Sequence, residues 1–178
     1  MALGDVGTDD VREQALRLRR PGVSFMKIGF AGAHRHCRLA DDVRALAAAI
    51  GSANLVLVAY ADYERADAPS PEAVVSLAGD TGAWGVLLDT HDKGSAALTS
   101  LMAPRELQTF VALAKGRGRV VALAGRLTAQ DVEPVRVTGA DILGVRGAAC
   151  NGGRTGAVAG ERVLGLRRQI DRTLSIVC

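Results

Sequence analysis

The chain has 178 residues, and 48% of them are hydrophobic, which is enough for one domain with a core of its own. The formal charge is only +3, and no basic tail with interleaved aromatic residues is present, so nucleic acid is a poor candidate for a partner. No apolar run is long enough to span a membrane, and the odd cysteines Cys37, Cys150 and Cys178 lack metal-ligand spacing, which favours a reduced, cytoplasmic protein.

Strand and helix patterns alternate along the chain. Residues 2–6 look like the end of an earlier strand, and five further strands are predicted at 23–30, 54–60, 83–89, 119–125 and 140–146. Helices are predicted at 8–20, 39–50, 71–78, 104–115, 129–137 and 161–173, the fifth interrupted near Pro134. This alternation predicts an α/β fold with a parallel sheet, in one domain over residues 1–178.

Charged residues fall late in three of these strands: Lys27, Asp89 and Arg146. Lys27 lies inside an apolar strand, whereas Asp89 ends its strand and is followed by Lys93. Strand alternation puts Lys27 and Asp89 on the face away from the helices, and chemistry in such folds sits at the carboxyl ends of strands. A snorkelling edge-strand lysine and a surface Asp89–Lys93 pair are the plainer interpretations. Only three of the 22 basic residues are lysines, and lysine, unlike arginine, can lose its proton or form a Schiff base.

A second group of residues suits an anion. Gly125, Gly144 and Gly147 follow the last two strands, where glycine lets backbone N–H groups approach a phosphate, and Arg146 supplies charge. Ordinary turn chemistry is the alternative. Asp62, which also ends a strand, is added to this substrate and phosphate set, although it suits a turn or helix cap equally well. No metal site and no cofactor are predicted.

Several motifs occur together in one order and resemble the (5-formylfuran-3-yl)methyl phosphate synthase family, also called 4-(hydroxymethyl)-2-furancarboxaldehyde-phosphate synthase. They are Phe25-Met26-Lys27-Ile28-Gly29, Ala59-Tyr60-Ala61-Asp62, Leu88-Asp89-Thr90 with Lys93-Gly94, Val121–Gly125, the run from Asp141 to Cys150, and Gly152-Gly153-Arg154. The resemblance implies a TIM-barrel lyase of methanofuran biosynthesis, in one-carbon metabolism, that condenses two molecules of glyceraldehyde 3-phosphate. It places Lys27, Asp89 and Lys93 at catalytic positions.

The chain departs from that family at its start. The family begins with two more strands and most of a third, and one carries an Asp-Val-Lys motif whose lysine is the expected Schiff-base former. We therefore expect the last five strands of a (β/α)8 barrel, a chain that either self-associates through its uncovered edges and apolar interior or is poorly stable, and little or no synthase activity. A non-catalytic phosphate-binding module and an open, flavodoxin-like α/β domain are the alternatives that the residues leave open.

Overall fold

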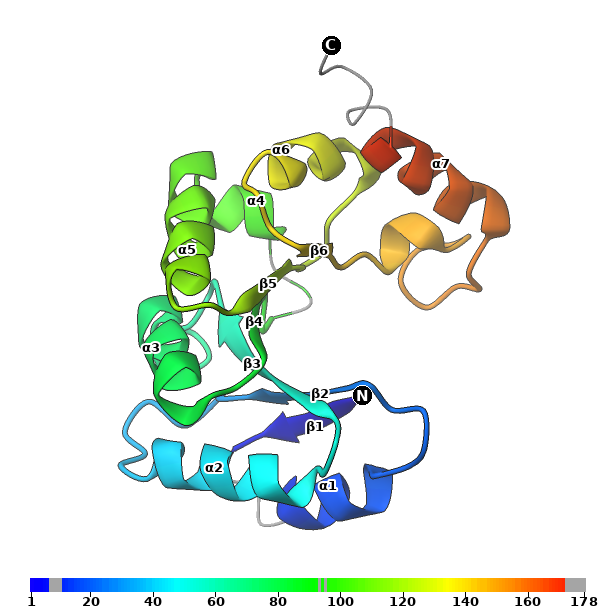
Figure 1. Ribbon diagram of the computed structural model, residues 1–178. Coiled ribbons are helices and arrows are strands. Elements are labelled where there is room, and N and C mark those ends of the chain that lie inside the picture. The colour runs from blue at the N-terminus through cyan, green and yellow to red at the C-terminus, as the bar shows by residue number, and fades with distance from the viewer. Residues whose placement is uncertain (7–10, 93, 95, 172–178) are drawn as a thin grey trace.

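A computed structural model describes residues 1–6, 11–92, 94 and 96–171, and Lys93 therefore lies outside the described residues. Its sheet is parallel, and its strands lie side by side in the order of the sequence (Figure 1). These strands are β1 (Ala2–Asp5), β2 (Phe25–Gly29), β3 (Asn54–Tyr60), β4 (Gly85–Asp89), β5 (Val120–Leu123) and β6 (Ile142–Leu143). The pairing runs from β1 to β6 without returning to β1, so the described sheet is not closed.

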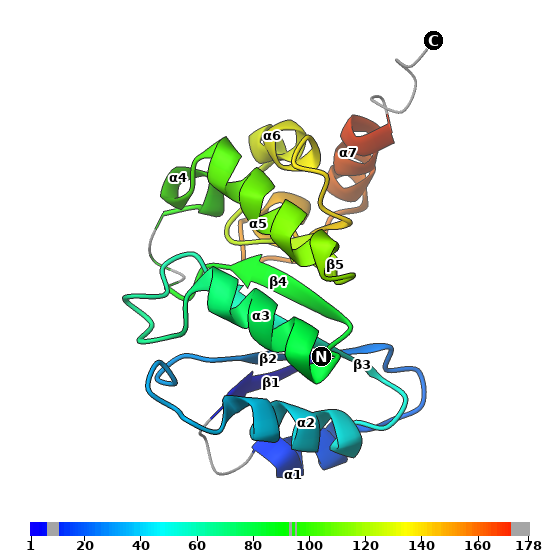
Figure 2. The ribbon, with the colours of Figure 1, turned by 60° about the vertical axis from the view of Figure 1, so that its left-hand side comes forward.

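Helices follow most of the strands and cover one face of the sheet (Figure 2). They are α1 (Val11–Leu18), α2 (Leu39–Ala49), α3 (Pro71–Thr81), α4 (Leu98–Leu101), α5 (Pro104–Gly116), α6 (Val132–Arg136) and α7 (Gly160–Asp171), with single 3-10 turns η1 (Ala129–Asp131) and η2 (Gly147–Ala149). Capping fixes the ends of α3: Ser70 Oγ accepts the N–H of Ala73, Pro71 begins the helix, and Gly82 ends it at a φ of 71°. None of the described helices is long and apolar enough to cross a bilayer.

The two faces of the sheet have separate packing. On the helix-covered face, Met26, Ile28 and Leu57 are fully buried among helix side chains. Burying each such side chain contributes about 1.5–3 kcal/mol. On the opposite, inner face, Lys27 lies beside Val56 in the register, and Tyr60 lies beside Asp89. The period-two alternation thus places Lys27, Tyr60 and Asp89 on the inner face.

The sequential strand order and one-sided helices confirm the predicted parallel β/α, barrel-like fold. They contradict the flavodoxin-like alternative, in which the second strand lies outside the first, in the order 2-1-3-4-5. Residues 2–5, expected to be the end of an earlier strand, form β1 and pair with β2, so the described sheet has this strand beside the five others that were predicted. Ala2 pairs with Lys27 and Asp5 with Gly29 in a register that shifts between them.

The last third of the chain departs most from the predicted elements. The strand predicted over 140–146 is only two residues long, because η2 begins at Gly147 and Asp141 turns its carboxylate back onto the N–H of Val121. The predicted helix at 129–137 divides into η1 and α6 between Asp131 and Val132, and Pro134 lies in the first turn of α6, where its missing N–H is tolerated. Helix α4, of four residues, carries too few positions for a periodic pattern.

Candidate functional site

Lys27 and Asp89 form an ion pair on the inner face of the sheet. Lys27 Nζ lies 3.9 Å from Asp89 Oδ2, and the two side chains are 41% and 15% exposed. The N–H of Thr90 donates to Asp89 Oδ1 at 2.8 Å, which fixes the orientation of the carboxylate. A partly exposed pair of this kind adds at most about 1 kcal/mol to stability. The ion pair therefore matters more for chemistry than for stability, because a neighbouring amine and carboxylate can exchange a proton.

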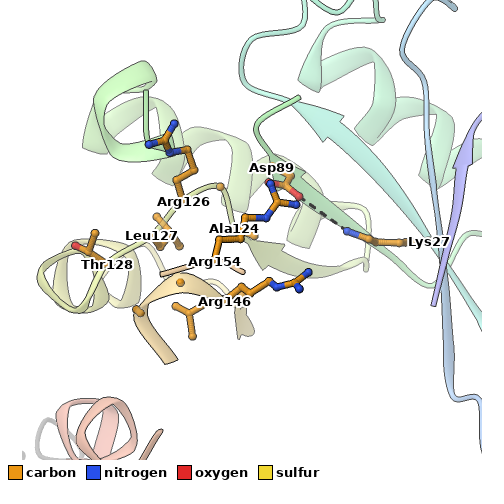
Figure 3. Close-up of a pocket in the computed structure, with 13 residues that line it drawn as sticks. Lys27, Asp89, Ala124, Arg126, Leu127, Thr128, Arg146 and Arg154 are labelled. Carbon is orange, nitrogen blue, oxygen red and sulfur yellow. Dashed lines mark ion pairs between the residues drawn. The ribbon is translucent and has the colours of Figure 1, made fainter. Parts of the chain in front are cut away.

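A cleft of about 510 Å³ opens beside this pair (Figure 3). That volume is in the range of sites for small molecules. Its wall comes from the ends of β5 and β6 and from η2, and includes four of the five predicted phosphate-site residues, Gly125, Gly144, Arg146 and Gly147. The structure thus brings Lys27 and Asp89 together with this predicted anion-binding group.

Two of the glycines are required by close packing. Gly125 has a φ of +111°, and a Cβ there would lie 2.9 Å from Thr90 Cγ2. A Cβ on Gly144 would lie 2.9 Å from the Cβ of Ala124. The N–H of Gly144 already donates to Leu123 O at 2.8 Å, so this glycine allows the close approach of Ala124 while its amide serves the sheet.

Two arginines make the cleft electropositive. Arg146 precedes η2, and Arg154 belongs to the loop that follows it. Figure 3 shows both guanidinium groups extending toward the side of the cleft where Lys27 and Asp89 lie, whereas Arg126 extends away from them. Three cationic groups around one carboxylate suit an anion, and guanidinium matches phosphate in geometry. The sequence pointed to Arg146 directly, whereas Arg154 lies in an irregular loop, where no periodicity indicates its direction.

Asp62 does not line this cleft. It is buried, and its oxygens accept the N–H groups of His91 and Asp92 at 2.7 and 2.9 Å. Burial alone would raise the pKa of Asp62, but these backbone donors outweigh it, and the pKa is lowered below its usual value. The Asp62 carboxylate therefore holds the backbone of the segment that follows β4.

A second, smaller cavity of about 250 Å³ adjoins the Lys27–Asp89 pair on its other side, and three of its polar residues were not predicted. Tyr60 donates its hydroxyl to Asp5 Oδ1 at 2.7 Å, and the N–H of Ala31 donates to the same oxygen at 2.9 Å. His91 meets the Tyr60 ring edge-on, with centroids 5.2 Å apart.

Tyr60 keeps its proton in this setting. Burial, the hydrogen bond to Asp5 and the negative charges of Asp5 and Asp89 all raise the pKa of Tyr60 far above its usual value. The strand alternation that singled out Lys27 also places Tyr60 on the inner face. This alternation was the sequence signal by which Tyr60 could have been predicted as a site residue. Among the described residues, no three His, Cys, Asp or Glu side chains gather as metal ligands would.

Comparison with known proteins shows one consistent likeness. A family model described as 4-HFC-P synthase matches residues 1–167. The (5-formylfuran-3-yl)methyl phosphate synthase of Methanothermobacter thermautotrophicus is 32% identical over 155 residues, covering 84% of this chain and 66% of that protein. The protein of the same name from Methanopyrus kandleri is 33% identical over 147 residues, covering 80% and 62%. The chain thus spans about two thirds of the length of these relatives.

Among solved structures, the phosphoribosyl anthranilate isomerase of Thermus thermophilus superposes with a TM-score of 0.41 at 16% identity. The superposition covers 97% of this chain and 98% of that chain, and is too distant to inform the function.

Proposed function

The chain belongs to the 4-HFC-P synthase family, and we propose that its inner face is the triose-phosphate-binding wall of a synthase for methanofuran biosynthesis. The proposed reaction condenses two molecules of glyceraldehyde 3-phosphate into a furan aldehyde phosphate. The observation that carries this proposal is the 3.9 Å Lys27–Asp89 pair at the edge of a cleft that also holds Arg146 and Arg154.

The anion-binding side of the cleft would take the phosphate. Arg146 and Arg154 would provide charge-assisted hydrogen bonds, and Gly125 and Gly147 line the same cleft with backbone alone. The aldehyde end of the substrate would then lie toward Lys27 and Asp89. Holding both ends in this way orients the carbonyl carbon for attack.

The covalent step in this proposal is an imine. A neutral lysine amine, of Lys27 or of Lys93, attacks the aldehyde carbon, a C–N bond forms, and the carbonyl oxygen leaves as water with the two hydrogens of the amine. Asp89 accepts a proton from the nitrogen and returns it to the departing oxygen, so no net proton is consumed. Removal of a proton from the neighbouring carbon then gives the nucleophile that joins the second triose.

Trapping with borohydride tests this chemistry. Glyceraldehyde 3-phosphate and sodium borohydride are added to the protein, and the reduced adduct is located by peptide mass mapping. We expect an adduct on Lys27 or Lys93 in the wild type and much less adduct in Asp89→Asn. Lys115 is the internal control, because it does not line the cleft and its Nζ lies 2.9 Å from Asp141 Oδ1. Labelling spread evenly over exposed lysines would contradict the proposal.

A phosphate-binding role without turnover is the second candidate, favoured by the sheet that is not closed. It predicts the same binding of the phosphate, unchanged in Asp89→Asn, and no reduced adduct on any lysine. The trapping experiment therefore separates the two functions.

A further inference from the structure

The polar surface around the Lys27–Asp89 pair is divided by charge. On one side, Arg146 and Arg154 line the larger cleft. On the other side, the smaller cavity is lined by Asp5, Tyr60 and His91, together with the same Lys27 and Asp89. Lys27 and Asp89 are thus the common wall of two cavities with opposite electrostatic character.

The smaller cavity is unsuited to a phosphate. Asp5 and Asp89 contribute two carboxylates to a space that contains a single lysine, and their negative charges would repel a phosphate dianion. The Asp5 carboxylate and the Tyr60 oxygen are acceptors, and neutral hydroxyl groups are the donors that they can bind.

Close packing and hydrogen bonds fix the polar wall of the smaller cavity. Gly29 lies opposite Asp5 in the β1–β2 register, and a Cβ at Gly29 would overlap both Asp5 Oδ1 and the Tyr60 hydroxyl. The hydrogen bonds from Tyr60 and Ala31 hold the Asp5 carboxylate in one orientation. Such fixed acceptors are pre-organised for a ligand, because little side-chain entropy remains to be lost on binding.

We propose that Asp5, Tyr60 and His91 form the binding site for the uncharged hydroxyl group of the triose phosphate, on the carbon next to the reacting aldehyde. The phosphate would lie on the arginine side, the aldehyde carbon at Lys27, and the hydroxyl group of the neighbouring carbon on the Asp5 side. This inference rests on the proposed function and adds to it a fixed direction for the substrate.

The test compares two probes by isothermal titration: glycerol 3-phosphate, which has hydroxyl groups, and inorganic phosphate, which does not. We expect Tyr60→Phe and Asp5→Asn each to weaken glycerol 3-phosphate binding about five- to tenfold, the usual loss for a hydrogen bond. The same variants should bind inorganic phosphate as the wild type does, which also shows that they are folded.

The outcomes separate the two claims. Equal loss of both probes in Tyr60→Phe and Asp5→Asn, or no loss of either, would overturn the assignment of the hydroxyl site while leaving the phosphate cleft in place. A wild-type protein that binds neither probe would contradict the proposed function, and the hydroxyl site with it.

Discussion

Tyr60 donates its hydroxyl to Asp5 across 2.7 Å, which joins the last residue of β3 to the last residue of β1 over the top of β2. The bond crosses Gly29, the residue of β2 that lies between them. It holds the short first strand in the sheet and shapes the wall of the smaller cavity. The position of β1 and the proposed binding of the substrate hydroxyl group therefore depend on the same three residues, Asp5, Gly29 and Tyr60.

The first prediction concerns Gly29→Ala. The added methyl group would overlap Asp5 and Tyr60, so the free energy of unfolding should fall by about 1–3 kcal/mol, as in other overpacked sites. Denaturant unfolding measures this change. Gly165→Ala, within α7 and with open space around a new Cβ, is the control and should be neutral or stabilising by about 0.5–1 kcal/mol. Equal stability of Gly29→Ala and the wild type would refute the close approach.

The second prediction concerns Asp62→Asn. The His91 and Asp92 N–H groups bind different oxygens of Asp62, and asparagine replaces one of these oxygens with an NH2 group, so one part-buried donor loses its acceptor, at a cost of about 1–3 kcal/mol. Chemical denaturation near neutral pH measures this loss.

Acid should reduce the difference in unfolding free energy between the wild type and Asp62→Asn. The pKa of Asp62 is lowered on folding from an ordinary value of 3.8, so its contribution is fully present above that pH and is lost as the pH falls through the folded-state pKa. Unfolding free energies of wild type and Asp62→Asn should therefore converge below about pH 4. A difference that stays constant from neutral pH into acid would show that ionised Asp62 does not hold the segment.

The third prediction concerns turnover. Because the described sheet is not closed, one side of the Lys27–Asp89 pair lacks a wall to orient a second triose and exclude water. We expect formation of the furan product to be at least about a hundredfold slower than for the Methanothermobacter thermautotrophicus relative. A direct product assay at matched substrate saturation checks this, and comparable rates for the two proteins would be evidence against it.

Regular strands explain what could be predicted from the sequence. Lys27 and Asp89 sit on strands with clear alternation, so their shared face followed from spacing alone. Asp62 was assigned to the substrate because its position at a strand end was visible, whereas its partners in the segment after β4 were not. The Tyr60–Asp5 bond depends on a shifted register between β1 and β2, which no local pattern encodes.

The proposed function requires that the cleft between Lys27 and the two arginines, Arg146 and Arg154, bind a triose phosphate. Isothermal titration of glyceraldehyde 3-phosphate into wild type, Arg146→Ala and Arg154→Ala tests it directly, with Arg167→Ala as a control that removes the same charge from an exposed position on α7. We expect at least a tenfold weaker affinity in each cleft variant, the usual cost of losing a charge-assisted hydrogen bond, and no change in Arg167→Ala. Equal affinities in all four proteins would show that the two arginines do not bind the phosphate.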